Sequence, residues 1–164
     1  METVKLNLGL RLLSMLIDHI IMCLIIVVIL APVMMLDVKL PLSLYFFIIA
    51  FSLYFCKDSI NGQSIGKRLF GFQLVNIKNN KPATAFQCVI RNLFCVLWPI
   101  EVVVTLFSRN RRIGDFVAFT MLIKKDNNLT KNNNNVRSIL LAYVFAIALM
   151  FSFYFLFLDS YISK

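Results

Sequence analysis

Arg11 and Asp18 are charged residues at the beginning of, and within, a long apolar segment. Seven residues on an α-helix turn through about 700°, so the two side chains share one face and lie roughly 10 Å apart along the axis. That distance prevents a direct pair. Because an unpaired charge at membrane depth costs at least a few kcal/mol, each needs a partner elsewhere. Arg11 is long enough to reach the interface, whereas Asp18 is not, so Asp18 is the stronger anomaly.

Several basic residues are candidate partners for Asp18, and the sequence does not choose among them. They are Lys67, Arg68, Arg91, Arg111 and Arg112. For Arg11 we expect Asp115, because both should lie near the same membrane boundary. An arginine can hold a carboxylate through two parallel hydrogen bonds. We therefore predict that a bidentate Arg11–Asp115 pair clamps a loop to the first apolar segment.

Three further polar residues lie in or beside the apolar segments. His19 is either a proton relay beside Asp18, because histidine titrates near pH 6.5, or a polar neighbour at the headgroup boundary. Arg91 and Glu101 are either partners of other charges or residues near an interface. We interpret all three as structural rather than as parts of an ion path.

The composition argues against a soluble globular domain. Hydrophobic residues make up 60% of the 164 residues, against roughly 45–50% in soluble domains. The net charge of +9 is concentrated between apolar segments, which is typical of membrane orientation and of anionic headgroups as partners rather than nucleic acid. The sequence contains no motif that predicts a metal site, a cofactor or an enzyme.

Four apolar segments predict an all-α integral membrane protein, a small helical bundle. The segments 12–36 and 40–56 form an expected helical hairpin joined by a short turn. The last segment, 138–158, has 21 residues without a charge, enough to cross the roughly 30 Å hydrocarbon core. The segment 84–107 is harder to interpret, because Pro99 in its middle should kink or break a helix.

Two basic stretches, 57–83 and 108–137, bear on the interpretation of segment 84–107. If that segment crosses the membrane, the stretches lie on opposite sides, although both carry the positive charge typical of cytoplasmic loops. If it bends at Pro99 and returns, both stay on one side. We favour this re-entrant arrangement, which gives three or four membrane segments with the N-terminus and both basic loops in the cytoplasm.

Strand-like runs and a polar stretch complete the expected organisation. Residues 70–77 and 116–123 are rich in β-branched and aromatic side chains, so we expect two strands that pair in a small cytoplasmic loop region. The Asn-rich stretch 126–137 predicts a flexible linker. The chain then divides into a membrane domain at 1–125, this linker, and a transmembrane helix at 138–164.

Arg11, Asp18 and Asp115 together resemble the signature of the RDD family of small prokaryotic membrane proteins, named for one arginine and two aspartates. The stretch 62–75, GQSIGKRLFGFQLV, is similar to the family's G-x-S-x-G-K-R-x-x-G-x-x-x-V motif. The resemblance covers about residues 5–125. Two positions depart from it, since Gly114 stands where a histidine is usual and Phe119 where a glycine is common.

The loop motif and the second basic cluster supply the remaining candidate residues. We expect the glycines in close turns and the basic residues at anionic lipid headgroups. The set is Gly62, Ser64, Gly66, Lys67, Arg68, Gly71, Arg109, Arg111 and Arg112.

The resemblance implies a bacterial or archaeal inner membrane, and it leaves the activity open. Transport is often suggested for the family, and cation–proton exchange is proposed for some members. We predict a non-catalytic subunit or regulator of a larger membrane assembly, with other membrane proteins or further copies of the chain as partners. Its intramembrane charges would lock the fold or pair with a partner. The alternative is a secondary ion or proton transporter that uses Asp18.

Overall fold

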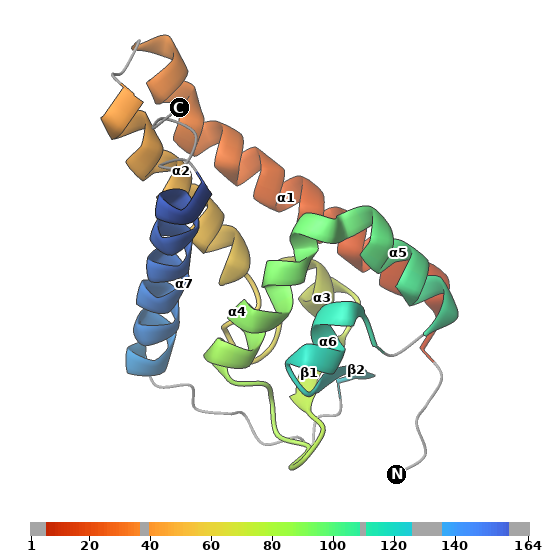
Figure 1. Cartoon of the computed structure of the whole chain (residues 1–164). Helices are drawn as coiled ribbons and strands as arrows, with labels where there is room; N and C mark the ends of the chain where they lie inside the picture. The colour runs from red at the N-terminus through yellow and green to blue at the C-terminus, as the bar shows by residue number, and fades with distance from the viewer. Residues whose placement is uncertain (1–5, 37–39, 109–110, 126–135, 158–164) are drawn as a thin grey trace.

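A computed structural model describes residues 6–36, 40–108, 111–125 and 136–157. The long helix α1 runs diagonally across the molecule, α2 packs against its upper part, and α7 lies at the left beside α2 and α4, while the short helices and two strands fill the lower right (Figure 1). The elements in chain order are α1 (Leu8–Met35), α2 (Leu40–Phe55), α3 (Ile65–Leu69), β1 (Phe72–Asn76), α4 (Ala85–Leu93), η1 (Phe94–Leu97), α5 (Trp98–Phe107), α6 (Ile113–Val117), β2 (Thr120–Lys124) and α7 (Val136–Phe157).

The long helices begin and end close to the predicted segments. α1 begins earlier than expected, at Leu8 rather than residue 12, because the Asn7 side chain caps it by accepting from the Gly9 N–H at 3.0 Å. This places both Arg11 and Asp18 inside the helix. α1 and α2 form the expected hairpin, and α7 packs beside α2.

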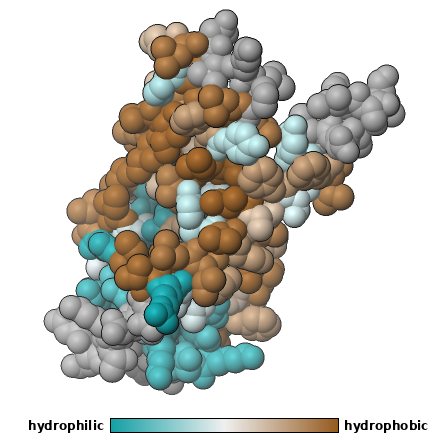
Figure 2. Space-filling view, turned by 90° about the vertical axis from the view of Figure 1, so that its left-hand side faces the viewer, coloured by the Kyte–Doolittle hydropathy of each residue, from teal (hydrophilic) through white to brown (hydrophobic). Residues whose placement is uncertain are grey.

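Two helices, Leu8–Met35 and Val136–Leu156, are long and apolar enough to cross a membrane. Only 17% and 11% of their most apolar windows are buried inside the molecule. A helix in the core of a soluble protein would be mostly buried, so these apolar surfaces are consistent with a membrane protein. Hydrophobic residues cover the middle and upper part of the face in Figure 2, and hydrophilic residues gather at its lower end.

The segment 84–107 is broken, as Pro99 predicted. The chain rises through α4, turns through the 3₁₀ helix η1, and descends through α5 (Figure 1). Thr84 and Gln87 form a capping box at the start of α4. Pro99 occupies the first turn of α5, where its missing N–H leaves no helical hydrogen bond unmade. The reversal therefore lies in η1, just before the proline.

The two strands pair as expected, antiparallel, with Leu74 opposite Leu122 at the centre of the register. The run 116–123 is only partly a strand, however, because its first residues belong to α6 and β2 begins at Thr120. Phe119 separates the two elements with a left-handed backbone, φ 53. Since β1 and β2 lie in different basic stretches, their pairing brings residues 72–76 and 120–124 together at one end of the molecule, which we call the basic end.

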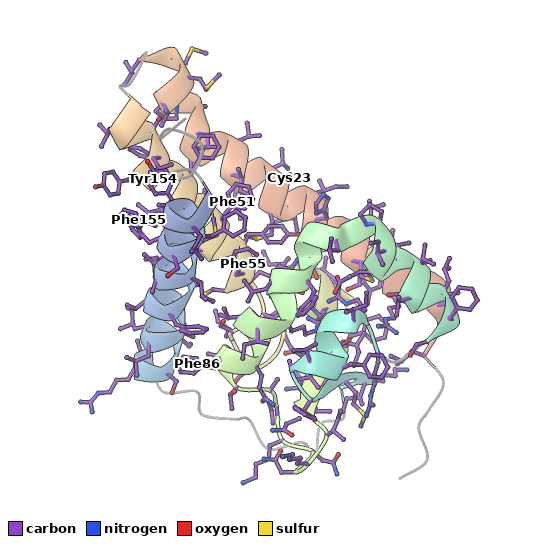
Figure 3. All side chains as sticks on the ribbon, in the orientation of Figure 1. Cys23, Phe51, Phe55, Phe86, Tyr154 and Phe155 are labelled. Atoms are coloured by element: carbon purple, nitrogen blue, oxygen red, sulfur yellow. The ribbon has the colours of Figure 1, made fainter. Side chains whose placement is uncertain are left out.

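Two hydrophobic clusters hold this arrangement together. The larger lies among α1, α2, α4 and α7, where Ala142 and Ala146 are fully buried and allow α7 to pack closely. Phe86 of α4 extends toward the lower half of α7 (Figure 3), and its ring centroid lies 5.7 Å from that of Phe145. The smaller cluster lies at the basic end and includes Leu74 and Leu122. The first cluster fixes the bundle, and the second supports the charged residues described next.

Candidate functional site

A buried ionic network lies between α1 and the basic end. It contains four cations and four acids, so its formal charges cancel. None of the eight residues is more than 5% exposed. Buried charges are tolerated when they are paired and hydrogen-bonded. The members are Arg11, Lys67, Arg91 and Arg112 with Asp18, Asp58, Glu101 and Asp115.

Asp18 is held by the loop motif rather than by an arginine. The Ser64 hydroxyl and the Gly66 N–H, the latter at 2.7 Å, donate to its two carboxylate oxygens. Lys67 Nζ lies 3.7 Å away and completes the site. A Cβ on Gly66 would lie 2.6 Å from the Ser14 carbonyl oxygen and 2.9 Å from the Asp18 carboxylate. The glycine thus allows α3 to approach α1 closely enough to bind Asp18.

Asp58 is the network member that sequence reasoning missed. It follows the end of α2 and lies at 0% exposure, with one oxygen bound to Lys67 and the other 2.7 Å from Arg91 Nη1. Its position could have predicted this role, because Asp58 lies two residues beyond an apolar segment and the other charges of the network also lie in or beside apolar segments.

Arg91 joins the two halves of the network. Its Nε donates to Asp115 and its Nη1 to Asp58, so a single guanidinium bridges an acid of α6 and an acid of the turn after α2. Arg91 is 1% exposed and pairs with two acids, which is the first of its two expected roles. Asp115 also accepts the Arg112 N–H at 2.9 Å and the Thr120 hydroxyl at 3.0 Å.

The predicted Arg11–Asp115 pair exists, but it is not bidentate. Arg11 Nη2 lies 3.9 Å from the carboxylate, and Nη1 instead donates to the Ser108 carbonyl oxygen at 3.0 Å. Arg91 binds Oδ1 of Asp115, and Oδ2, the atom that Arg11 approaches, accepts from the Arg112 N–H. Arg11 therefore ties α1 to the loop after α5 through a backbone carbonyl as much as through charge.

The two basic clusters divide between the interior and the surface. Arg112 is 4% exposed and pairs with Glu101 at 3.2 Å, and Lys67 is 3% exposed, so the prediction that these two face lipid was wrong. Arg68 is exposed and Arg111 partly so. Arg109 lies outside the described residues. Glu101 belongs to the network and is fully buried.

His19 lies beside a small cavity at the edge of the network. One ring nitrogen is 3.1 Å from the Tyr54 hydroxyl, and the other is 3.6 Å from the Cys23 thiol. The cavity has a volume of about 10 Å³, room for about one water molecule, and its lining includes Asp18, Lys67 and the histidine. His19 is thus a neighbour of Asp18 through this cavity, without a direct hydrogen bond between them among the contacts described.

The two acids of the basic end are kept ionised by their surroundings. Burial by itself raises the pKa of the Asp58 carboxyl, but Lys67 and Arg91 outweigh it and hold that pKa well below its ordinary value. Burial likewise raises the pKa of Asp115, and Arg91 and Arg112 lower it further than burial raises it. Both groups therefore remain carboxylates across the physiological range.

The glycines of the motif and the two departures from it have structural explanations. Gly62 adopts φ 65, and a Cβ there would lie 2.5 Å from the Leu74 carbonyl oxygen. Phe119 adopts φ 53, the left-handed conformation that favours glycine, which is the residue common in the resembling family. At Gly114 a Cβ would lie only 2.2 Å from the Arg91 carbonyl oxygen. This chain therefore has no room at that position for the histidine usual elsewhere.

These observations define a small helical membrane protein in which α1 and a G-x-S-x-G-K-R loop enclose a charge-balanced network. The RDD family model matches residues 7–162, nearly the whole chain. The chain belongs to the RDD family. The match continues through the Asn-rich stretch and α7, beyond residues 5–125 on which the sequence resemblance rested. No curated protein and no solved structure matches the chain.

Proposed function

We propose that the chain is a non-catalytic subunit or regulator of a larger membrane assembly, and that the ionic network locks its own fold. The supporting observation is that the four cations and four acids neutralise one another within this chain. Charges paired in this way need no transported ion to neutralise them. Their common role is to fix α1, α3, α4 and α6 in one arrangement.

The depth of the network supports a structural role. The charge-free part of α1 from Ile20 to Met35 is about 24 Å long at 1.5 Å per residue, close to the roughly 30 Å thickness of the hydrocarbon core. Asp18 precedes that part, so it would lie near one boundary of the membrane. Substrate sites of secondary transporters usually lie near the midplane, at the interface of inverted repeats.

The same lengths support the re-entrant topology. α4 has 9 residues and α5 has 10, about 14 Å and 15 Å, so neither crosses the core alone. Pairing of β1 with β2 keeps the two basic stretches together. Because positively charged loops usually stay on the cytoplasmic side, we propose that the basic end faces the cytoplasm and that the helices lie in a bacterial inner membrane.

Cysteine labelling tests this topology. We expect a membrane-impermeant maleimide to modify Lys78→Cys and Lys124→Cys from the cytoplasmic side only, because β1 and β2 hold both positions at one end. Leu36→Cys, at the opposite end of α1 and 75% exposed, is the matched control and should react from the other side. Right-side-out and inverted vesicles provide the measurement. Reaction of the two lysine positions from opposite sides would refute the re-entrant arrangement.

An apolar groove offers a place for a partner helix. It lies between α1 and α5, has a volume of about 410 Å³, and is lined by Gly9, Leu12, Leu13, Met15, Leu16 and Val102. Small residues let helices approach closely inside a membrane. We propose that a partner helix packs there, with Gly9 at the point of closest approach.

Gentle extraction in a mild detergent tests the assembly. We expect the chain at native abundance to migrate as a larger complex, and Leu13→Trp to release it by filling the groove. Leu156→Trp on α7, where the leucine is 72% exposed, is the control and should leave the complex intact. The measurement is native electrophoresis with mass spectrometry of copurifying proteins. A wild-type chain that migrates alone at its own mass contradicts the proposal.

The second candidate function is a cation–proton transporter, and the cavity beside Asp18 and His19 is the observation that favours it. In proteoliposomes that contain only this chain, a pH gradient would then drive cation-dependent proton flux. That flux should disappear in Asp18→Asn and persist in Lys81→Gln, an exposed residue that does not line the cavity. Such a result would overturn the subunit proposal. If no cation tested gives a flux, the transporter function is excluded.

A further inference from the structure

A second open groove lies at the basic end, on the surface between α3 and the end of β2. Its volume is about 420 Å³, and it is lined by Ile60, Asn61, Gln63, Arg68 and Lys125. Two of the five lining residues are cations, two are amides, and none is an acid. The groove is therefore positively charged and rich in hydrogen-bond donors.

The two cations of the groove are available to a ligand. Arg68 and Lys125 are both exposed, and in the part of the chain that the structure describes neither forms an ion pair. The neighbouring acid Asp58 is buried and already neutralised by Lys67 and Arg91. Nothing in the described lining thus competes with an incoming anion.

The backbone holds the groove in a fixed shape. Lys125 N–H donates to the Gly71 carbonyl oxygen at 2.7 Å, which ties the end of β2 to the turn after Arg68. On the other wall, the Asn61 carbonyl oxygen accepts from the Gln73 side chain at 3.0 Å. The two cations therefore sit on elements whose separation is set before any ligand arrives, which reduces the entropy cost of binding.

Exposed apolar side chains lie close to the groove in the sequence, and they favour a lipid headgroup over a free anion as the ligand. Ile60, in its wall, is 53% exposed, and Ile65 and Leu69 on α3 are 52% and 68% exposed. Ile65 and Leu69 are four residues apart, so they share a face of α3, and Arg68 lies between them in the sequence of that helix. Apolar side chains beside cations at the end of a membrane helix are typical of a surface that lies among lipid headgroups.

We propose that this groove binds the phosphate of an anionic membrane lipid. Arg68 and Lys125 hold the phosphate oxygens by charge-assisted hydrogen bonds, and Ile60, Ile65 and Leu69 contact the glycerol and the upper acyl chain. The site is separate from the ionic network, because Lys67 faces inward while its neighbour Arg68 faces the groove.

Native mass spectrometry of the full chain, extracted in detergent and titrated with phosphatidylglycerol or phosphatidylcholine, tests the proposal. We expect one phosphatidylglycerol to bind tightly and phosphatidylcholine not to. The double variant R68Q/K125Q should raise the Kd for phosphatidylglycerol about 25-fold, roughly fivefold for each cation at a membrane surface. Because both residues are exposed, the variant should fold, and an unchanged far-UV circular dichroism spectrum checks this.

The control variant K81Q/R137Q removes two exposed cations that lie outside the groove, and its Kd should stay within twofold of wild type. An equal loss in the control would overturn the site, because binding would then depend only on total charge. Glycerol phosphate serves as a soluble probe with the same anionic group. Binding of glycerol phosphate as tightly as phosphatidylglycerol, or tight binding of phosphatidylcholine, would overturn the lipid assignment.

Discussion

Replacing Arg91 with methionine should lower the free energy of unfolding by about 3–5 kcal/mol, the usual cost of removing one partner from a buried ion pair. Arg91 bridges Asp58 and Asp115, both at 0% exposure. Without it, the two carboxylates lose their shared counter-ion. Asp115 then keeps the weaker 3.9 Å contact with Arg11, the N–H of Arg112 and the Thr120 hydroxyl, and Asp58 keeps Lys67. Unfolding by sodium dodecyl sulfate in mixed micelles, followed by circular dichroism, measures the change.

Two comparisons separate lost charge pairing from a general packing defect. Arg137→Met removes an exposed cation at the start of α7 and should change stability by no more than about 0.5 kcal/mol. The double variant Arg91→Met with Asp115→Asn should be less damaging than the sum of the single changes, because the neutral amide no longer needs a counter-ion. A coupling of at least about 1 kcal/mol is expected. Strict additivity would show that the pair is not energetically coupled.

Gly114→Ala should lower the free energy of unfolding by about 3 kcal/mol, the upper part of the usual range for overpacking a tight interior. The added Cβ would lie 2.2 Å from the Arg91 carbonyl oxygen and 3.0 Å from its carbonyl carbon. Those atoms belong to the backbone of α4, so they cannot rotate aside as a flexible side chain would. Either α6 moves away from α4 or Asp115 loses its contact with Arg91. The same mixed-micelle titration measures the effect.

Gly9→Ala is the matched control for that substitution. A Cβ at Gly9 would meet only the Asn7 side-chain oxygen, at an ordinary 3.5 Å. The residue lies in the first turn of α1, where alanine is the better helix former. Stability should be unchanged or slightly higher. A loss at Gly9 as large as at Gly114 would mean that the close contact between α4 and α6 is not the cause.

The bounds of two of the apolar helices and the break in segment 84–107 could be predicted from the sequence, because both depend on local composition. The apolar runs 40–56 and 138–158 correspond to α2 and α7 within two residues at either end. The break near Pro99 followed from proline's missing N–H. The helix α6 was missed because residues 116–123 favour a strand locally, while residues 113–117 form a helical turn that delivers Asp115 to Arg91.

The pairing within the network could not be read from spacing. Lys67 and Arg68 are adjacent basic residues, yet the first is 3% exposed and buried against Asp58 while the second faces outward. The orientation of a five-residue helix decides between them, and packing on α1 fixes that orientation. Asp58 and Arg91 are 33 residues apart, so no helical or strand periodicity relates them. The resemblance identified Arg11, Asp18 and Asp115 without revealing that Arg91 connects them.

The order of the network residues along the chain determines when each of them is synthesised. Arg11 and the Ser108 carbonyl that it binds are 97 residues apart, and Asp115 comes later still. At roughly 5–20 residues per second, the ribosome needs roughly 5–20 s to make the second partner after the first. Throughout that interval Arg11 lacks its final contacts. Synthesis of α1 and closure of the network are therefore separate events in the making of this protein.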